Sequence, residues 1–234
     1  MTTIKNPFDI ESSEKVNCVY ISDFDEKCVW KITADKYKII KWLTIDFKPS
    51  TLSVTSEGQL LLTSESASIL RIYDSKAELI YSIQLRGDIK SPIHAVETSN
   101  RNFVILHRWK DIDESGESRS IARMRKAKWG ICVLTRDGQM VISRFIPSNK
   151  TEKLDDPKYL SVDSDDRVFL ADYTNRRVIL LQANLKWNRI LCPTNNENIL
   201  PWRLCYDQEK KELLVGGRDL YLGDGVRIYT LSRE

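Results

Sequence analysis

The stretch Pro157-Lys-Tyr-Leu-Ser-Val-Asp163, followed by Arg167-Val-Phe-Leu-Ala-Asp-Tyr-Thr-Asn-Arg-Arg-Val-Ile-Leu180, shows most clearly how this 234-residue chain folds. Its apolar runs, Val168–Leu170 and Val178–Leu181, are too short for helices and too apolar for exposed loops. A proline suits the first residue of a strand, which need not donate a hydrogen bond to the sheet. With the later run Trp187–Leu191, the stretch predicts four antiparallel strands.

The same pattern recurs along the whole chain. Five prolines open similar units, at intervals of 42, 43, 65 and 44 residues: Pro7, Pro49, Pro92, Pro157 and Pro201. Three residues after each proline the side chain is apolar, at Ile10, Leu52, Ala95, Leu160 and Leu204. Second and third apolar runs follow in all five units, and a fourth in the first four. The long interval contains an insertion of about 22 residues in the third unit.

Units of about 40–45 residues with four strands each are typical of β-propeller blades. A single blade cannot cover both of its faces, and blades packed side by side bury them. We therefore expect an all-β chain in which residues 1–234 form one propeller domain of four-stranded antiparallel blades, with five repeats. Hairpin turns such as Arg136-Asp-Gly138 would join the third and fourth strands.

The stretch 157–180 resembles an NHL repeat, with its proline, its Ala171-Asp172 pair, and Asn175 and Arg176 before the third strand. The other units carry Ser22-Asp23, Thr63-Ser64, Leu106-His107 and Gly216-Gly217 at the Ala-Asp position. NHL propellers commonly have six blades. The resemblance therefore implies either five blades, with Met1–Asn6 supplying a closing strand, or an incomplete six-bladed propeller.

Composition and charge exclude several function classes. Lys and Arg number 36 and Asp and Glu 33, and this net charge of +3 is too small for a protein that binds nucleic acid over its whole surface. No apolar run approaches the roughly 20 residues that span a bilayer, and the N-terminus does not resemble a signal peptide. The five cysteines show no metal-ligand spacing. We expect reduced thiols in a cytoplasmic protein that contacts no membrane.

Residues that carry chemistry are scarce. With two histidines and no nucleophile or phosphate-binding motif, we expect no cofactor, no metal and no small-molecule substrate. Asp172 and Asp23 are interpreted as acceptors that hold turns. The residues expected near the strand starts on the central channel are a mixed set: Asp9, Thr51, His94, Tyr159 and Arg203.

The insertion, residues 109–129, has an acidic first half and a basic second half that includes Arg123, Arg125, Lys126 and Lys128. It is either a solvated loop or an element that docks a partner. Trp109 and Trp129 bracket it and are expected to anchor it on the propeller.

In a propeller, the loop between the second and third strands shares a face with the loop that leads into the first strand. The basic half of the insertion should therefore join a basic and aromatic surface made of Lys158, Tyr159, Arg176, Arg177, Trp202 and Arg203. Such a surface suits a protein hot spot, and it suits phosphate contacts with base stacking equally well.

Three functions follow as hypotheses. The first is a non-catalytic scaffold that binds a protein partner; the NHL resemblance implies a substrate-recognition part of a TRIM-type ubiquitin ligase. The second is single-stranded RNA binding by the same face. The third is a metal-dependent lyase or hydrolase, because similar propellers include such enzymes.

Overall fold

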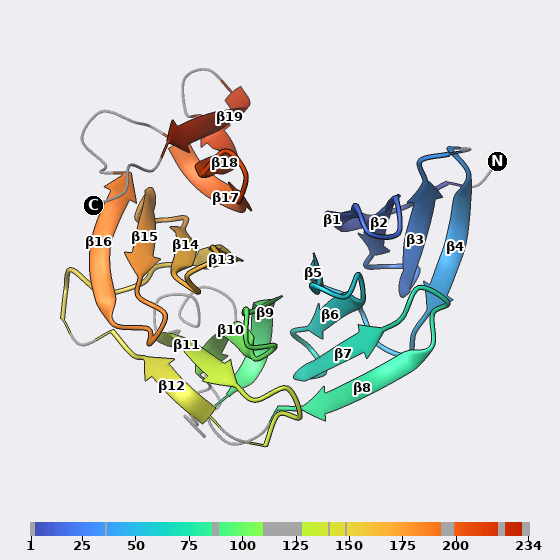
Figure 1. Cartoon of the computed structure of the whole chain (residues 1–234), viewed down its shortest axis with the longest axis horizontal. Helices are drawn as coiled ribbons and strands as arrows, with labels where there is room; N and C mark the ends of the chain where they lie inside the picture. The colour runs from blue at the N-terminus through green and yellow to red at the C-terminus, as the bar shows by residue number, and fades with distance from the viewer. Residues whose placement is uncertain are drawn as a thin grey trace, which may run out of the picture. The chain divides into compact units, whose positions relative to one another are not determined.

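The computed structural model describes residues 3–35, 37–85, 89–109, 128–139, 141–147, 149–192, 199–219 and 223–230. In these ranges the chain forms nineteen strands and no helix. The strands belong to five antiparallel sheets that follow one another along the sequence, as predicted for a β-propeller (Figure 1).

The first sheet has the order β1-β2-β3-β4 and the second β5-β6-β7-β8. Their strands are β1 (Pro7–Ser13), β2 (Cys18–Asp23), β3 (Cys28–Thr33), β4 (Ile39–Thr44), β5 (Leu52–Val54), β6 (Leu60–Ser64), β7 (Ile69–Tyr73) and β8 (Leu79–Gln84). The third sheet, β9-β10-β11-β12, contains β9 (Lys90–Glu97), β10 (Phe103–Trp109), β11 (Lys128–Leu134) and β12 (Val141–Phe145).

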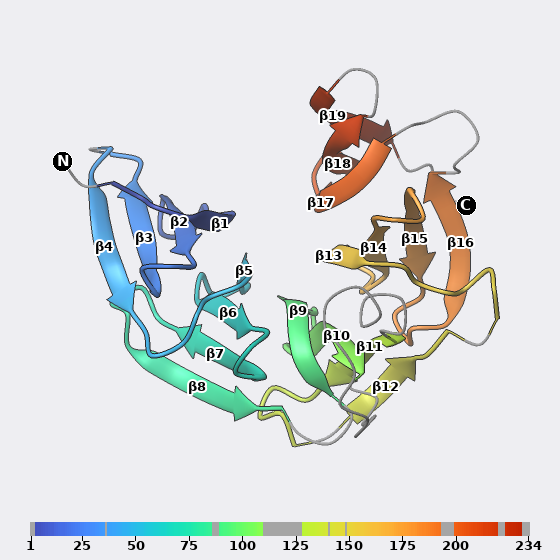
Figure 2. The same ribbon diagram turned by 180° about the vertical axis from the view of Figure 1, so that it is seen from behind.

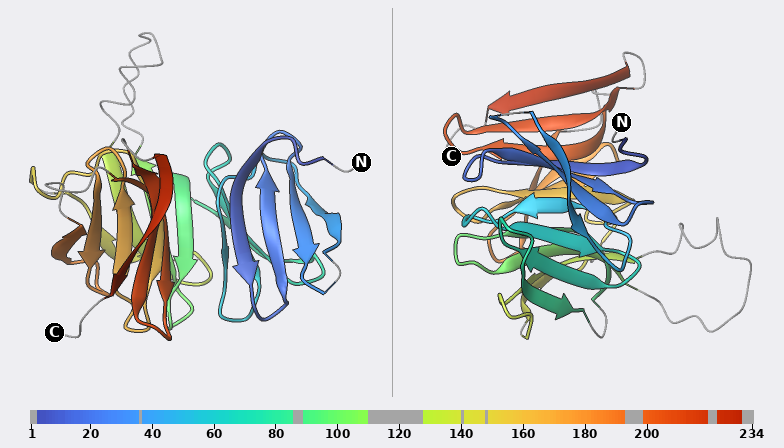
Figure 3. Two further views of the ribbon diagram at one scale, coloured as in Figure 1. Left: turned by 90° about the horizontal axis from the view of Figure 1, so that it is seen from above. Right: turned by 90° about the vertical axis from the view of Figure 1, so that its right-hand side faces the viewer.

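The fourth and fifth sheets have the orders β13-β14-β15-β16 and β17-β18-β19 (Figure 2). Their strands are β13 (Pro157–Val162), β14 (Val168–Asp172), β15 (Arg177–Leu181), β16 (Trp187–Cys192), β17 (Ile199–Asp207), β18 (Glu212–Asp219) and β19 (Gly223–Thr230). Within each sheet, neighbouring strands run in opposite directions (Figure 3). The fourth strand that the sequence predicts in the first four repeats is present in each of the first four sheets. In the fifth sheet the described residues form three strands.

By its contacts the chain divides into two compact units. Unit 1 comprises residues 1–108 and 134–140, and unit 2 comprises residues 109–133 and 141–234. Each has its own core of side chains that neighbouring sheets bury between them. Leu52, Leu62 and Val29 belong to a core of unit 1, and Phe169, Val178 and Val215 to a core of unit 2.

Next to three of the repeat prolines the strand pairing is irregular, which the repeat pattern did not predict. The register of strand pairing shifts between Pro7 and Asp9, between Pro157 and Tyr159, and between Pro201 and Arg203. The residue after each of these prolines is therefore the extra residue of a bulge, a feature that redirects side chains. The redirected residues are Phe8, Lys158 and Trp202.

At two positions, burial differs from what an apolar strand sequence indicates. Ile10 has the same repeat position as Leu52 and Leu160, yet it is 51% exposed, whereas they are fully buried. Cys205 lies among apolar strand residues but is exposed. Cys18, Cys28 and Cys132 are buried, and none of these four cysteines is in a disulfide.

None of the described segments is a helix long and apolar enough to cross a membrane.

Candidate functional site

The strongest candidate site lies in unit 2, where two bulges place their extra residues near each other. Lys158 comes from the start of β13, Trp202 from the start of β17, and Tyr173 from the turn between β14 and β15. We call Lys158, Tyr173, Trp202 and Asp156 the Trp202 cluster.

The Trp202 cluster is arranged around the ammonium group of Lys158. The Trp202 and Tyr173 rings meet edge to face, with centroids 5.3 Å apart and planes at 90°. The Lys158 Nζ atom lies 5.1 Å from the Trp202 centroid and 5.5 Å from the Tyr173 centroid. It also forms an ion pair of 2.7 Å with Asp156. Trp202 remains 49% exposed, so a large aromatic surface faces solvent in a fixed orientation.

The other predicted residues of this surface have different surroundings. The Arg203 guanidinium lies 4.7 Å from the Tyr159 ring centroid and donates to the Tyr159 hydroxyl at 2.8 Å. Arg177 is buried and donates to Asp172 and to the Thr151 and Lys153 carbonyls, which leaves it outside the exposed surface. Arg176 is exposed in the adjoining turn.

The basic half of the insertion lies outside the described residues, so the structure does not show whether Arg123, Arg125 and Lys126 join this surface. Lys128 begins β11, and its side chain is also outside the description. Of the two bracketing tryptophans, Trp129 is buried at 6% exposure, which fits an anchor.

Asp172 and Asp23 hold turns, as the sequence indicated. Asp172 accepts from the Asp155 backbone N–H, Asn175 and Arg177, and so fixes both the Tyr173 turn and the chain entering β13. Burial raises the pKa of Asp172, and these hydrogen bonds oppose that rise. At Asp23, burial again opposes ionisation, but hydrogen bonds from Lys5 N, Glu26 N and Trp30 Nε1 outweigh it and lower the pKa.

The residues expected at the strand starts connect neighbouring sheets. In unit 1, Asp9 Oδ2 accepts from the Leu52 N–H at 2.8 Å, and the Thr51 hydroxyl donates to the Ile93 carbonyl at 2.6 Å. His94 is buried, with its Nε2 3.4 Å from the Leu52 carbonyl oxygen. In unit 2, Arg203 and Tyr159 make the equivalent connection. These five side chains therefore stabilise the packing of adjacent sheets.

A second aromatic and cationic cluster occurs in unit 1, around the bulge residue Phe8. Phe8 stacks on Phe24, with centroids 5.7 Å apart. The Lys48 Nζ atom lies 4.4 Å from the Phe24 centroid and 3.9 Å from Asp25 Oδ1. Phe24 follows Asp23 just as Tyr173 follows Asp172, so one aromatic ring of each cluster comes from the same repeat position, whereas the lysines come from different positions. We call Phe8, Phe24, Asp25 and Lys48 the Phe8 cluster.

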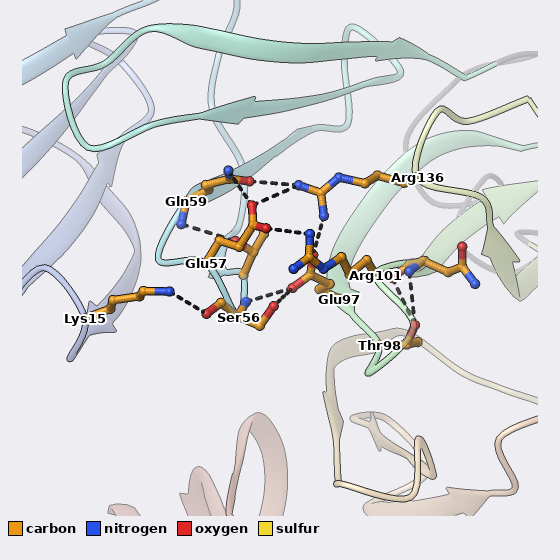
Figure 4. A network of polar contacts seen from close by, with 10 residues as sticks. Lys15, Ser56, Glu57, Gln59, Glu97, Thr98, Arg101 and Arg136 are labelled. Carbon is orange, nitrogen blue, oxygen red and sulfur yellow. Dashed lines mark hydrogen bonds and ion pairs between the residues drawn. The ribbon is translucent and has the colours of Figure 1, made fainter.

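Unit 1 also contains a polar network that joins turns of three sheets (Figure 4). Arg136 donates to Glu97 at 3.0 Å and to Gln59 at 3.1 Å, and it pairs with Glu57 at 3.4 Å. The turn that presents Arg136 is held by Asp137, which accepts from Thr135 and Gln139, and by Gly138 with a φ of 71°.

Glu97 is the buried centre of this network, with a side chain 3% exposed. It also accepts from the Ser56 N–H and hydroxyl, at 2.7 and 2.8 Å. Arg101 pairs with Glu57 at 2.6 Å, and Lys15 donates to the Ser56 carbonyl at 3.4 Å (Figure 4). Each carboxylate is paired with an arginine, so the network links neighbouring sheets. We call it the Arg136 clasp; its members are Lys15, Ser56, Glu57, Gln59, Glu97, Arg101 and Arg136.

Across the described ranges, no three His, Cys, Asp or Glu side chains are grouped in a way that would hold a metal ion. His94 and His107 are both buried in the third sheet. Burial raises the pKa of the Cys28 thiol to about 11, which favours the protonated thiol at neutral pH.

Sequence reasoning missed Tyr173 and Asp156 as members of the site. An alignment of the five repeats on their prolines would have indicated these positions, since Phe8, Lys158 and Trp202 all directly follow a repeat proline. Tyr173 and Phe24 likewise both follow the turn-holding aspartate. The clasp around Arg136 gave no such signal, because its members come from three different repeats.

The sheet order and the repeated strand starts define this chain as a β-propeller. No family model and no curated protein sequence matches it. Among solved structures it is similar to a streptogramin B lyase, with a TM-score of 0.65 and 16% identity over 100% of this chain and 72% of the other.

Two further structures show the same likeness. One is a gluconolactonase-like protein, with a TM-score of 0.67 and 13% identity over 97% of this chain and 76% of the other. The other is a catalytically inactive virginiamycin B lyase variant from Staphylococcus aureus with quinupristin, with a TM-score of 0.65 and 15% identity over 100% and 73%. Identities this low establish the fold and leave the function open.

Proposed function

We propose that this chain is a non-catalytic interaction module that binds a protein partner through the Trp202 cluster. The observation that carries the proposal is the half-exposed indole of Trp202, which packs edge to face against Tyr173 and is contacted by Lys158. Rigid, exposed aromatic side chains are typical hot spots, because they bury a large area on binding and lose little conformational freedom.

The local charges favour a protein over RNA as the partner. Phosphate binding needs cations that point outward and exchange counterions. Lys158 is instead paired with Asp156, Arg177 with Asp172, and Arg203 lies against Tyr159. Three of the predicted cations thus already have partners within unit 2, and Arg176 is the exposed one among the predicted cations described in the β13–β17 region.

The test compares partners cross-linked to the full chain with those of two variants. Trp202→Ala should lose specific partners, while Tyr37→Ala, which removes another exposed aromatic ring in unit 1, should keep them. Circular dichroism should show that both variants fold. An unchanged partner set for Trp202→Ala would contradict the proposal, and a partner released by nuclease and by moderate salt would indicate RNA instead.

A second candidate function, a lyase or hydrolase, is favoured by the enzymes among the similar structures. In this chain the strand-start residues connect adjacent sheets, which makes the enzyme the weaker candidate. Metal analysis of the purified protein, with a screen of lactone and cyclic depsipeptide substrates, tests it directly. Turnover that requires a bound metal would favour the enzyme over the interaction module.

The narrower expectation, that the chain recognises substrates for a TRIM-type ubiquitin ligase, depends on the NHL resemblance of residues 157–180. It stays a prediction. Co-purification of a ubiquitin ligase that is lost in the Trp202→Ala variant would support it.

A further inference from the structure

We infer that the Trp202 cluster is a receptor for a cationic side chain of the partner, and that Lys158 occupies it in the unbound protein as a built-in competitor. This inference rests on the proposed function and names the chemistry that the partner presents. Lysine, methylated lysine and arginine side chains belong to the chemical class that the cluster recognises.

The structure itself shows the cluster holding an ammonium group. The Nζ atom of Lys158 is within 5.1–5.5 Å of two ring centroids, inside the distance at which an aromatic face attracts a cation. Tryptophan provides the most favourable ring for this interaction. The Asp156 carboxylate completes the site with an opposite charge at 2.7 Å.

Lys158 is suited to be displaced. Its ammonium is carried on a flexible four-carbon chain, and the side chain keeps 22% of its surface exposed. When it moves away, the rings stay in place, because Tyr173 belongs to the turn fixed by Asp172 and Trp202 to the bulge after Pro201. A ligand cation would then find two aromatic rings and the Asp156 carboxylate.

The Phe8 cluster provides an internal comparison. Lys48 there contacts one ring at 4.4 Å, and its ion pair with Asp25 is longer, at 3.9 Å. Phenylalanine also attracts cations less strongly than tryptophan. A lysine thus lies on an aromatic surface in both units, although Lys158 follows its repeat proline and Lys48 precedes Pro49. The cluster in unit 2 has the more complete set of partners.

A built-in competitor lowers the apparent affinity by the fraction of molecules in which it occupies the site. Removing it should therefore strengthen binding. Since exposed cation–aromatic contacts are weak, we expect an increase in affinity of between about two- and fivefold.

The experiment titrates the full chain with tetramethylammonium chloride and follows the indole N–H resonance of Trp202 by NMR, assigned with Trp202→Phe. Sodium chloride at equal ionic strength is the control titrant. Lys158→Met should bind the probe two- to fivefold more tightly than the unmodified chain. Lys48→Met should leave the Trp202 response unchanged, and Asp156→Asn introduced beside Lys158→Met should weaken it.

Equal or weaker binding by Lys158→Met would overturn the inference, as would a Trp202 response that sodium reproduces. These results are distinguishable from failure of the proposed function. If Trp202→Ala loses its protein partners while Lys158→Met shows no gain for the cation, the interaction module stands and the cationic class of ligand is wrong.

Discussion

At the scale of single residues, aspartates at one repeat position fix the chain before the first strand of the first and fourth sheets. Asp23 is fully buried and accepts from Lys5 N, Asn6 N, Glu26 N and Trp30 Nε1. Ser64 takes the corresponding position in the second sheet and donates to the Lys48 carbonyl. The carboxylate of Asp23 thus satisfies backbone groups that would otherwise lack partners.

Asp23→Asn should lower the free energy of unfolding by about 1–3 kcal/mol at pH 7, because an amide cannot accept all of these bonds. The pKa of Asp23 is lowered in the folded protein, so its stabilisation is present above the ordinary aspartate pKa and is lost as the pH falls through the folded value. Urea denaturation at pH 7 and pH 3 should therefore show a smaller difference between variant and parent at pH 3.

The matched control is Asp165→Asn, at a carboxylate that is 74% exposed, which should change stability by less than about 0.5 kcal/mol at either pH. A difference for Asp23→Asn that stays constant or grows on acidification would contradict the assigned sign.

At the scale of elements, β15 and β19 are third strands with the same sequence pattern and different surroundings. Val178 and Leu180 in β15 are 0% and 2% exposed, whereas Val226 and Ile228 in β19 are 65% and 60% exposed. The difference follows from packing, because Val178 and Leu180 belong to the core that the fourth and fifth sheets bury between them, and β15 is also paired on both sides, by β14 and β16. In the described residues, β19 pairs with β18 alone.

Val178→Ala should consequently cost about 2 kcal/mol, since it removes buried methyl groups and leaves a cavity. Val226→Ala should cost less than about 0.5 kcal/mol. Thermal and urea denaturation of both variants measure the contrast. Equal losses would show that β19 is covered in solution.

At the scale of the whole molecule, contacts between sheets carry much of the organisation within each unit. In unit 1 the Arg136 clasp gathers turns of three sheets around the buried Glu97 carboxylate. In unit 2 the Ser161 hydroxyl accepts from the Tyr206 N–H between the fourth and fifth sheets.

A double-mutant cycle with Glu97→Gln and Arg136→Met should give a coupling energy of about 1 kcal/mol or more, because the pair is largely shielded from water. The exposed pair Lys210 and Asp207, at 3.7 Å, should couple by less than about 0.5 kcal/mol. Additive effects of Glu97→Gln and Arg136→Met would mean that the clasp contributes nothing beyond its separate hydrogen bonds.

The order and number of the strands were predictable from the sequence, because the period of the prolines and the lengths of the apolar runs are local properties of the chain. The turn-holding role of Asp172 was predictable for the same reason, since two of its partners, Asn175 and Arg177, lie within five residues. The fourth strands were also located to within a few residues, such as β16 over Trp187–Cys192.

Tertiary structure decided which of these residues are exposed and what they contact. Ile10 and Val226 look like core residues, but their burial depends on a neighbouring strand or sheet that their own sequence does not encode. Lys158 and Trp202 are 44 positions apart, and they meet because two bulges turn both side chains toward Tyr173. Contacts between distant repeats depend on how the sheets pack, so the Trp202 cluster appears only once the chain has folded.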